Sequence, residues 1–242
     1  MKKSLFAILL AFTLSSCDDL LKVLESTSSA TGISQTEAVS GLKQALEFGV
    51  NNGTSFLGKT DGFLKNAAYK IIMPKEVQDG ISKIKSNAIA NALAGPYIDK
   101  VVTAMNRGAE NAMAEAKPIF VNAIKSMTIT DAINIVKGGD GAATAYLKKA
   151  TSAQLKEKFT PVIKKSLDGV NINDPWTKVS SAYNIVMGKN VKTDLNDYVT
   201  ERAMDALFSQ IKSEEDKIRK DPVARITPIL KKVFSYADQY KR

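Results

Sequence analysis

Apolar residues recur three or four positions apart through most of this chain, and this spacing restricts its fold more than any other feature. The clearest stripe runs from Ile98 to Ala116 and is built from isoleucine, valine, methionine and alanine. Such spacing places apolar side chains on one face of an α-helix. No stretch clearly alternates apolar and polar residues as a half-buried strand would, and no repeat has a fixed period. The sequence therefore predicts an all-α fold, a single compact multi-helix domain over residues 35–242.

Capping residues, glycines and prolines predict where the helices begin and end. Ser34 with Glu37 has the spacing of a capping box, which predicts a start near residue 35. Further starts are expected at Pro74, Thr130-Asp131, Asp140, Thr151 with Gln154, Asp174-Pro175, Asp194 and Asp221-Pro222. Ends are expected at Asn51-Asn52-Gly53 and Gly95-Pro96, with a kink or restart at Pro118 and Pro161. The longest helix is rich in alanine and is expected at the centre, because small side chains let neighbouring helices approach.

The amino terminus has the pattern of an export signal. Lys2 and Lys3 precede an apolar run of about ten residues (4–13), which is too short to span a bilayer. The following Leu14-Ser15-Ser16-Cys17 resembles the lipobox of bacterial lipoproteins. In those proteins the signal is cut before a cysteine that carries diacylglycerol and an amino-terminal acyl chain such as palmitate.

This resemblance implies a signal peptide over 1–16, a lipidated Cys17 and a flexible tether over 17–34. Two or more acyl chains hold a protein stably on a membrane. We therefore expect the protein in the bacterial cell envelope, anchored by lipid to the outer membrane and facing the periplasm. The alternative is an ordinary secretory signal with an incidental cysteine.

Two features of the composition exclude whole classes of chemistry. Histidine is absent, so Ser-His-Asp and Cys-His catalysis and His-ligated zinc are excluded. Cys17 is the only cysteine, so no intrachain disulfide can form. We expect no metal site and no cofactor. An enzyme would have to use carboxylates, a Ser-Lys pair, tyrosine or an oxygen-ligated metal.

The first candidate site is Asn106, Arg107 and Glu110 in the longest helix. Asn106 and Glu110 are four residues apart and share a face, and Arg107 can pair with Glu110. They could form a polar site at the mouth of a pocket. An ion-pair network that fixes helix register, or a solvated helix face, is the favoured interpretation, because a buried charge must be paired.

A second candidate combines Asp131 with the turn Gly138-Gly139-Asp140-Gly141. Backbone N–H groups of such a turn could bind an anion at the next helix start. The turn lacks the lysine and spacing of a phosphate loop, and Asp140 would repel phosphate. A helix end followed by an N-cap at Asp140 is favoured.

The third candidate is Glu215 with Arg219 and Arg225. Glu215 and Arg219 are four residues apart with the acid first, the favoured order for an ion pair. Arg225 could fold back onto Glu214 or Asp221. A corner held by ion pairs explains the group at least as well as an anion bound by both arginines.

Six lysines lie over 148–165, and the last four avoid the face of Leu155, Phe159 and Ile163, which predicts an amphipathic helix with a cationic surface. The six lysines are Lys148, Lys149, Lys156, Lys158, Lys164 and Lys165. The cationic face could rest on anionic lipid headgroups, although a solvated surface is the common explanation. Nucleic acid is not expected as a partner, because the signal predicts export and the lysine face carries no stacking aromatic residues, Phe159 being on the opposite face.

Several segments together resemble a bacterial lipoprotein family catalogued as domain of unknown function 4197. They are GLKQALEFGV (41–50), DGFLKNAAYKIIMP (61–74), MNRGAENAMAEAKPIF (105–120), MTITDAINIVKGGDGAATAYL (127–147), DLNDYVTERAMDALF (194–208) and EEDKIRKDPVARITPILKKVF (214–234). The resemblance implies an all-helical envelope domain behind a lipobox. It implies no activity.

These features favour a non-catalytic binding or interaction module whose partner is an envelope protein, a lipid or a glycan. One alternative is a carrier of an apolar ligand or lipid in a helical cavity, since methionine-lined surfaces adapt to apolar partners. Another is a carboxylate-dependent hydrolase of cell-wall glycan with Glu110 as its acid. Two Ser-x-x-Lys matches, at Ser82 and Ser209, lie on amphipathic helices and carry little weight in a lysine-rich chain.

Overall fold

The computed structural model of the chain describes residues 33–238. The predicted signal peptide, Cys17 and the predicted tether up to residue 32 lie outside the described residues. The described part forms eight α-helices and one 3-10 helix. Their bounds are α2 Gln35–Gly58, α3 Lys75–Ser86, α4 Ala88–Lys125, α5 Ile129–Lys137, α6 Ala142–Gly169, α7 Asn173–Met187, α8 Leu195–Lys220, η1 Pro222–Ala224 and α9 Pro228–Asp238.

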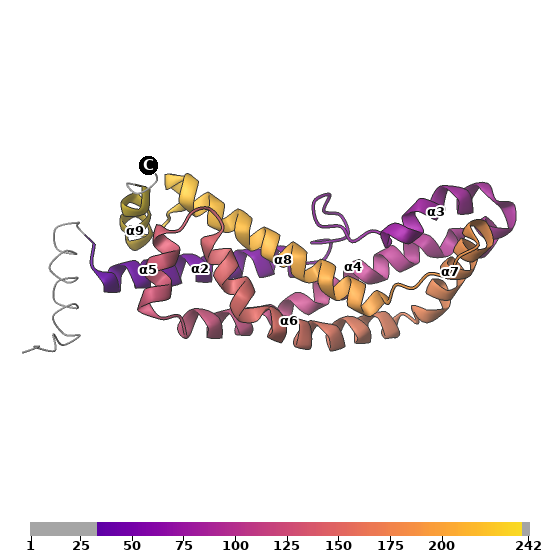
Figure 1. The fold of residues 1–242 in the computed structure, drawn as a ribbon, viewed down its shortest axis with the longest axis horizontal. Helices are drawn as coiled ribbons and strands as arrows, with labels where there is room; N and C mark the ends of the chain where they lie inside the picture. Colours follow the sequence, from indigo (N-terminus) through magenta and orange to yellow (C-terminus); the bar gives the residue numbers. More distant parts are fainter. Residues whose placement is uncertain (1–32, 239–242) are drawn as a thin grey trace, which may run out of the picture.

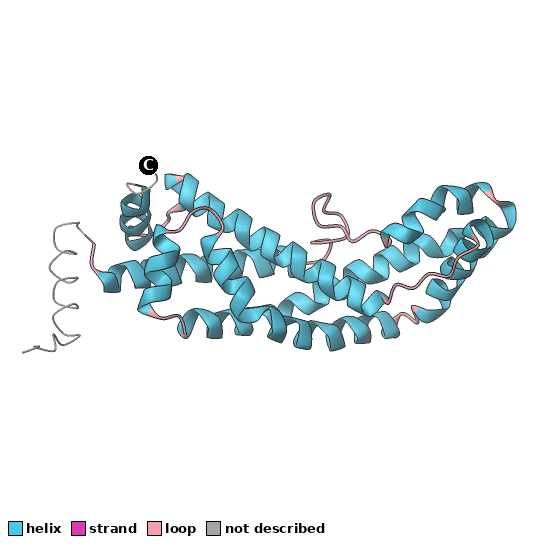
Figure 2. Ribbon diagram, viewed as in Figure 1, coloured by secondary structure: helices cyan, strands magenta, loops and turns pink. Residues whose placement is uncertain are grey.

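The helices form an elongated bundle (Figure 1). α2, α4, α6 and α8 run along its length, α3 and α7 lie at one end with the start of α4, and α5 and α9 lie at the other end. α4 contacts α2, α3, α6, α7 and α8, so the prediction that the longest helix is central is confirmed. Between residues 33 and 238 every element is a helix or a loop (Figure 2), which confirms the all-α prediction.

One hydrophobic core extends through all eight helices. α4 contributes small buried side chains to it along its whole length, among them Ala90, Ala104, Ala112 and Ala116. Small side chains let α6 and α2 pack closely on α4, so its apolar stripe is buried on several sides. Ile33, which the sequence assigns to the tether, is also buried in this core.

The predicted break at Gly95-Pro96 is wrong, because α4 runs through it. The helix begins instead after Asn87, whose side chain accepts a hydrogen bond from the Ala90 N–H at 2.9 Å. A residue before proline normally leaves the helical region because its Cβ meets the proline ring. Gly95 has no Cβ, which removes part of that clash.

Pro118 and Pro161 do not restart their helices either, since α4 and α6 are continuous across them. Thr151 is no cap, because its hydroxyl donates to the Leu147 C=O inside α6 at 2.7 Å. A proline removes one backbone hydrogen bond. Each helix stays in the core despite this loss, because buried residues flank the proline on both sides: Ala116 and Phe120 around Pro118, and Phe159 and Ile163 around Pro161.

Two predicted boundaries move because of neighbouring helices. α2 does not end at Asn51-Asn52-Gly53 but continues to Gly58, since Gly53 lies against α8, where a Cβ would be 3.5 Å from Ile211. Asp221-Pro222 opens only the short η1, and the last helix begins at Pro228. The capping box at Ser34 and the cap at Asp194 are confirmed.

Candidate functional site

The loop over residues 59–74, here called the strap, is held to α4 by Asn106. Asn106 is completely buried. Its Oδ1 accepts the Ile71 N–H at 2.8 Å, and its Nδ2 donates to the Ile71 C=O and the Val102 C=O, both at 2.7 Å. One side chain thus satisfies both backbone groups of Ile71. Because these groups are out of reach of water, losing the amide would leave them unpaired.

Glu110 holds the start of the strap one helical turn further along α4. Its Oε1 accepts the N–H groups of Phe63 at 3.0 Å and Leu64 at 3.1 Å. Its Oε2 pairs with Arg107 at 2.5 Å, and Arg107 also pairs with Asp61 at 2.7 Å. The pairing of Arg107 with Glu110 expected from the sequence is therefore present. It forms part of a network that fixes a loop of the same chain.

The charges of this cluster are balanced within it. Hydrogen bonds from Lys65 and Arg107 lower the pKa of the Asp61 carboxyl. Hydrogen bonds to Glu110 and Asp61 raise the pKa of Arg107. A general acid must donate a proton to its substrate, whereas both oxygens of Glu110 accept hydrogen bonds from protein donors. The cluster thus anchors the strap and gives no support to a carboxylate-dependent hydrolase.

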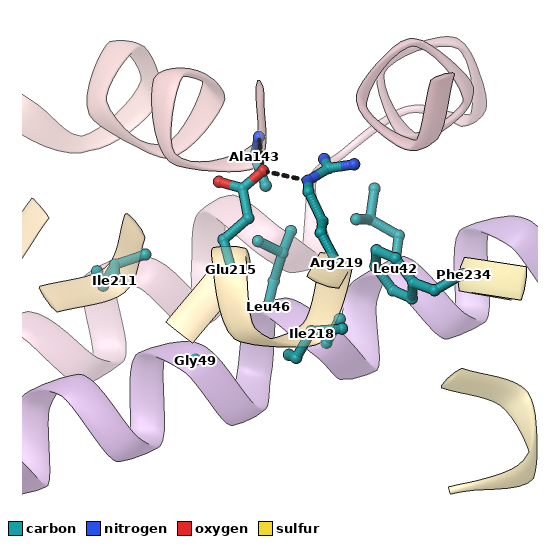
Figure 3. A pocket seen from close by; sticks show the side chains of 10 residues that line it. Leu42, Leu46, Gly49, Ala143, Ile211, Glu215, Ile218, Arg219 and Phe234 are labelled. Atoms are coloured by element: carbon teal, nitrogen blue, oxygen red, sulfur yellow. Dashed lines mark hydrogen bonds and ion pairs between the residues drawn. The ribbon is translucent and has the colours of Figure 1, made fainter. Parts of the chain in front are cut away.

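Glu215 belongs to a second polar cluster, at the α5–α6 corner (Figure 3). Its two oxygens accept the N–H groups of Ala143 at 3.0 Å and Thr144 at 2.8 Å, and the Thr144 hydroxyl at 2.7 Å. Glu215 therefore caps the amino terminus of α6, where the helix dipole favours a negative charge. The expected pair with Arg219 is present, with Nε 2.8 Å from the carboxylate.

Arg219 is almost completely buried and joins two helix ends. Besides pairing with Glu215, its guanidinium donates to the Ile135 C=O at 2.9 Å and the Gly138 C=O at 3.2 Å. Ile135 is in the last turn of α5, where its C=O also accepts the Gly138 N–H at 3.2 Å, and Gly138 follows the helix directly. The single Glu215–Arg219 pair thus connects α5, α6 and α8.

Arg225 is buried and caps α8. It donates to the C=O groups of Ile218 at 2.9 Å and Arg219 at 2.8 Å, and pairs with Asp238 of α9 at 2.8 Å. The prediction that it folds back onto Glu214 or Asp221 is wrong, because the packing of α9 places Asp238 beside it. Backbone carbonyls and carboxylates satisfy both arginines, so an anion held between them gains no support.

Asp131 is the third residue of α5 and forms a capping box with Thr128. The Thr128 Oγ1 accepts the Asp131 N–H, and Asp131 accepts the Thr128 N–H, both at 3.1 Å. Hydrogen bonds from the Thr128 hydroxyl and N–H lower the pKa of Asp131. The predicted cap at Thr130-Asp131 is therefore wrong by two residues.

Asp140 lies in the turn before α6, and the prediction that it is the N-cap of this helix is wrong. The cap position is Gly141, at φ 83°, a left-handed conformation that favours glycine. Glu215 accepts the first free N–H groups of α6, so no side chain at the cap itself is needed for them. Asp140 instead pairs with Lys220 at 2.7 Å and raises the pKa of that lysine.

The candidate residues thus form two clusters on different helix pairs. Asn106, Arg107 and Glu110 lie under the strap, whereas Glu215, Arg219, Arg225 and Asp140 lie around the end of α8. Asp131, at the start of α5, bonds to Thr128 and belongs to neither cluster. In the described residues 33–238 no group of three or more acidic or cysteine side chains could hold a metal ion.

A surface groove of about 600 Å³ lies between the strap, the start of α3 and α8. The Tyr198 hydroxyl donates to the Ile72 C=O at 3.0 Å, and the Tyr69 hydroxyl to Gln210 at 2.9 Å, so the two walls are tied together. The groove lining mixes aromatic, apolar and charged side chains, including Tyr69, Lys70, Ile72, Lys75, Tyr198, Arg202, Asp205 and Ser209.

Sequence reasoning did not identify this groove. The available signal was the spacing of Tyr198 and Arg202, four residues apart, which puts the guanidinium 5.9 Å from the ring centre.

A smaller hollow of about 20 Å³ lies among α2, α6, α8 and α9 beside Glu215 and Arg219 (Figure 3). Leu42, Leu46 and Phe234 line it. A volume of ~10–15 Å³ holds one water molecule, whereas ligand pockets measure ~300–1,000 Å³. This interior hollow therefore cannot hold the apolar ligand of a carrier.

The lysines of α6 are all exposed, whereas Leu155, Phe159 and Ile163 are buried, so the predicted amphipathic helix is confirmed. Acidic groups offset part of its charge. Lys164 pairs with Asp168 at 2.6 Å, and Lys156 lies 4.0 Å from Glu201.

Between residues 33 and 238, no helix by itself has the length and apolar character needed to cross a membrane. α4 and α5 have that length and apolar character only when taken together, and the two helices are bent by 103° relative to each other.

Comparison with curated proteins and with solved structures gives no match. A family comparison does, and its match covers residues 32–235, nearly all of the described structure. The chain therefore belongs to the family described as protein of unknown function (DUF4197).

Proposed function

We propose that this protein is a lipid-anchored, non-catalytic binding module of the bacterial cell envelope, and that its ligand binds in the groove between the strap and α8. The observation that carries the proposal is the fixed wall of the groove. Buried Asn106 and Glu110 use their polar groups to hold the strap, which forms one side of a hollow of about 600 Å³. A preformed concave site lowers the ordering cost of binding.

The groove lining indicates the class of ligand. Tyr69 and Tyr198 offer flat apolar faces, Lys70 and Lys75 supply positive charge, and Arg202 pairs with Asp205 at 3.1 Å. An envelope protein segment, a lipid headgroup or a glycan could each use this combination. The polar and charged walls fit such ligands better than they fit a purely apolar one.

The groove is tested by blocking it in the lipidated full chain. Ser209→Trp places an indole in the groove, and Asn111→Trp is the matched control in a separate hollow of about 480 Å³ between α4 and α6. Molecules that co-purify from membranes are identified by untargeted mass spectrometry. We expect one lipid, glycan fragment or protein to be lost with Ser209→Trp and kept with Asn111→Trp. An unchanged set for both variants would contradict the proposal.

The anchor is tested separately through Cys17. Cys17→Ser removes the acyl acceptor, so the chain should lose palmitate labelling and move to the soluble fraction. Unchanged retention on the membrane would refute the anchor but leave the groove untouched.

A further inference from the structure

The turn between α8 and α9, residues 221–228, exposes two large apolar side chains. Val223 is 84% exposed and Ile226 is 65% exposed. Pro222 and Pro228 bracket them and limit the conformations of the turn. Val223 and Ile226 therefore point outward from a rigid turn, although exposing apolar side chains to water is unfavourable.

The backbone of this turn is satisfied from within. The N–H of Val223 bonds to the Asp221 carboxylate at 2.9 Å, and the N–H of Ala224 to the Asp221 C=O at 3.1 Å. The N–H groups of Arg225 and Ile226 bond to backbone carbonyls at 3.3 and 3.0 Å. Every N–H from 223 to 226 thus has an acceptor. A segment with paired donors can leave water without the cost of stripping them.

The one cation inside the turn points away from solvent. Arg225 is only 2% exposed, because it caps α8 and pairs with Asp238. Exposed lysines stand beside the turn: Lys231, and Lys220, which also pairs with Asp140 at 2.7 Å. Apolar tips flanked by lysines suit the boundary between acyl chains and anionic headgroups.

The turn lies at the end of the bundle where the described chain begins. The Thr227 hydroxyl bonds to Gln44 of α2 at 2.5 Å, and Lys232 of α9 pairs with Glu37 in the first turn of α2 at 2.7 Å. α9 and the start of α2 lie at the same end in Figure 1. Sixteen residues (17–32) precede Ile33 and span at most ~58 Å when extended, so a bilayer holding Cys17 is within reach.

We infer that this turn inserts Val223 and Ile226 into the interfacial region of the bilayer that holds the anchor, so that the bundle stands end-on and α3 and α7 point away from the membrane. The inference rests on the proposed lipid anchor. It gives the anchored domain a defined orientation and keeps the groove above the bilayer.

The test places one fluorophore at each end of the lipidated full chain. Acylation blocks Cys17, the only cysteine, so a thiol introduced by Val223→Cys is the single free thiol. Ile89→Cys is the matched control, because Ile89 is 72% exposed at the start of α4, at the opposite end. Each chain is labelled with a nitrobenzoxadiazole maleimide and reconstituted in phosphatidylethanolamine–phosphatidylglycerol vesicles.

We expect aqueous iodide to quench the label at 223 about threefold less than the label at 89, since interfacial groups lie ~5–10 Å inside the headgroup boundary. Spin-labelled lipid should quench the label at 223 alone. Equal iodide quenching at both positions, as in a bundle lying flat on the α6 lysines, would overturn the inference while the chain still floats with the vesicles. A chain that does not float with the vesicles would instead refute the anchor, and the inference with it.

Discussion

Replacing Asn106 with alanine tests whether buried polar groups hold the strap. The substitution removes the only side chain that bonds both backbone groups of Ile71, at 2.8 and 2.7 Å. Each buried group left unpaired costs about 1–3 kcal/mol. Alanine returns about 0.7 kcal/mol through its higher helix propensity. The free energy of unfolding should therefore fall by about 1–5 kcal/mol.

Asn122→Ala is the matched control, because Asn122 is an exposed asparagine of the same helix. It gains the same helix propensity and should raise the free energy of unfolding by about 0.7 kcal/mol or less. Urea unfolding followed by circular dichroism gives both values. Hydrogen exchange gives a local measure, since the Ile71 amide should exchange faster in Asn106→Ala alone. A loss below about 1 kcal/mol relative to the control, with Ile71 still protected, would refute the role of Asn106.

Three further predictions use the same unfolding measurement. Gly41→Ala should destabilise the protein by about 1–3 kcal/mol, because the new Cβ would lie 2.5 Å from Val233. Gly49→Ala has room for its Cβ and should stabilise the protein by about 0.5–1 kcal/mol. A change of the free energy of unfolding in the same direction for both variants would contradict this reasoning. Arg219→Met should cost about 3–5 kcal/mol by leaving a buried carboxylate unpaired, and a neutral result would show that the pair is dispensable. Hydrogen bonds from Lys232 and Ser34 lower the pKa of Glu37 to about 2 from 4.5, so its stabilisation is present above pH 4.5 and lost as pH falls towards 2; melting temperatures of Glu37→Gln should fall less across that window.

Local patterns were sufficient for part of the fold. The helical spacing of apolar residues predicts the all-α class, and Ser34 and Asp194 begin the helices that their side chains cap. These features depend on residues within one or two turns of each other, which is the range that a linear pattern encodes.

The prolines show that local patterns do not always predict where a helix ends. Pro96 and Pro161 have the same local effect as a helix-ending proline, yet both lie inside continuous helices. Whether a missing hydrogen bond breaks a helix depends on how much apolar surface is buried on both sides of it, and that quantity is set by the neighbouring helices.

The sequence by itself determined that Glu215 pairs with Arg219, because four residues of helix separate them. Only the tertiary structure decided that this pair caps α5 and α6, more than seventy residues away, and that Asn106 holds the strap. A side chain's spacing along its helix says which neighbours it has on that helix. It does not say which free backbone groups the packing of other helices brings to it, and those groups determine what a buried polar residue does.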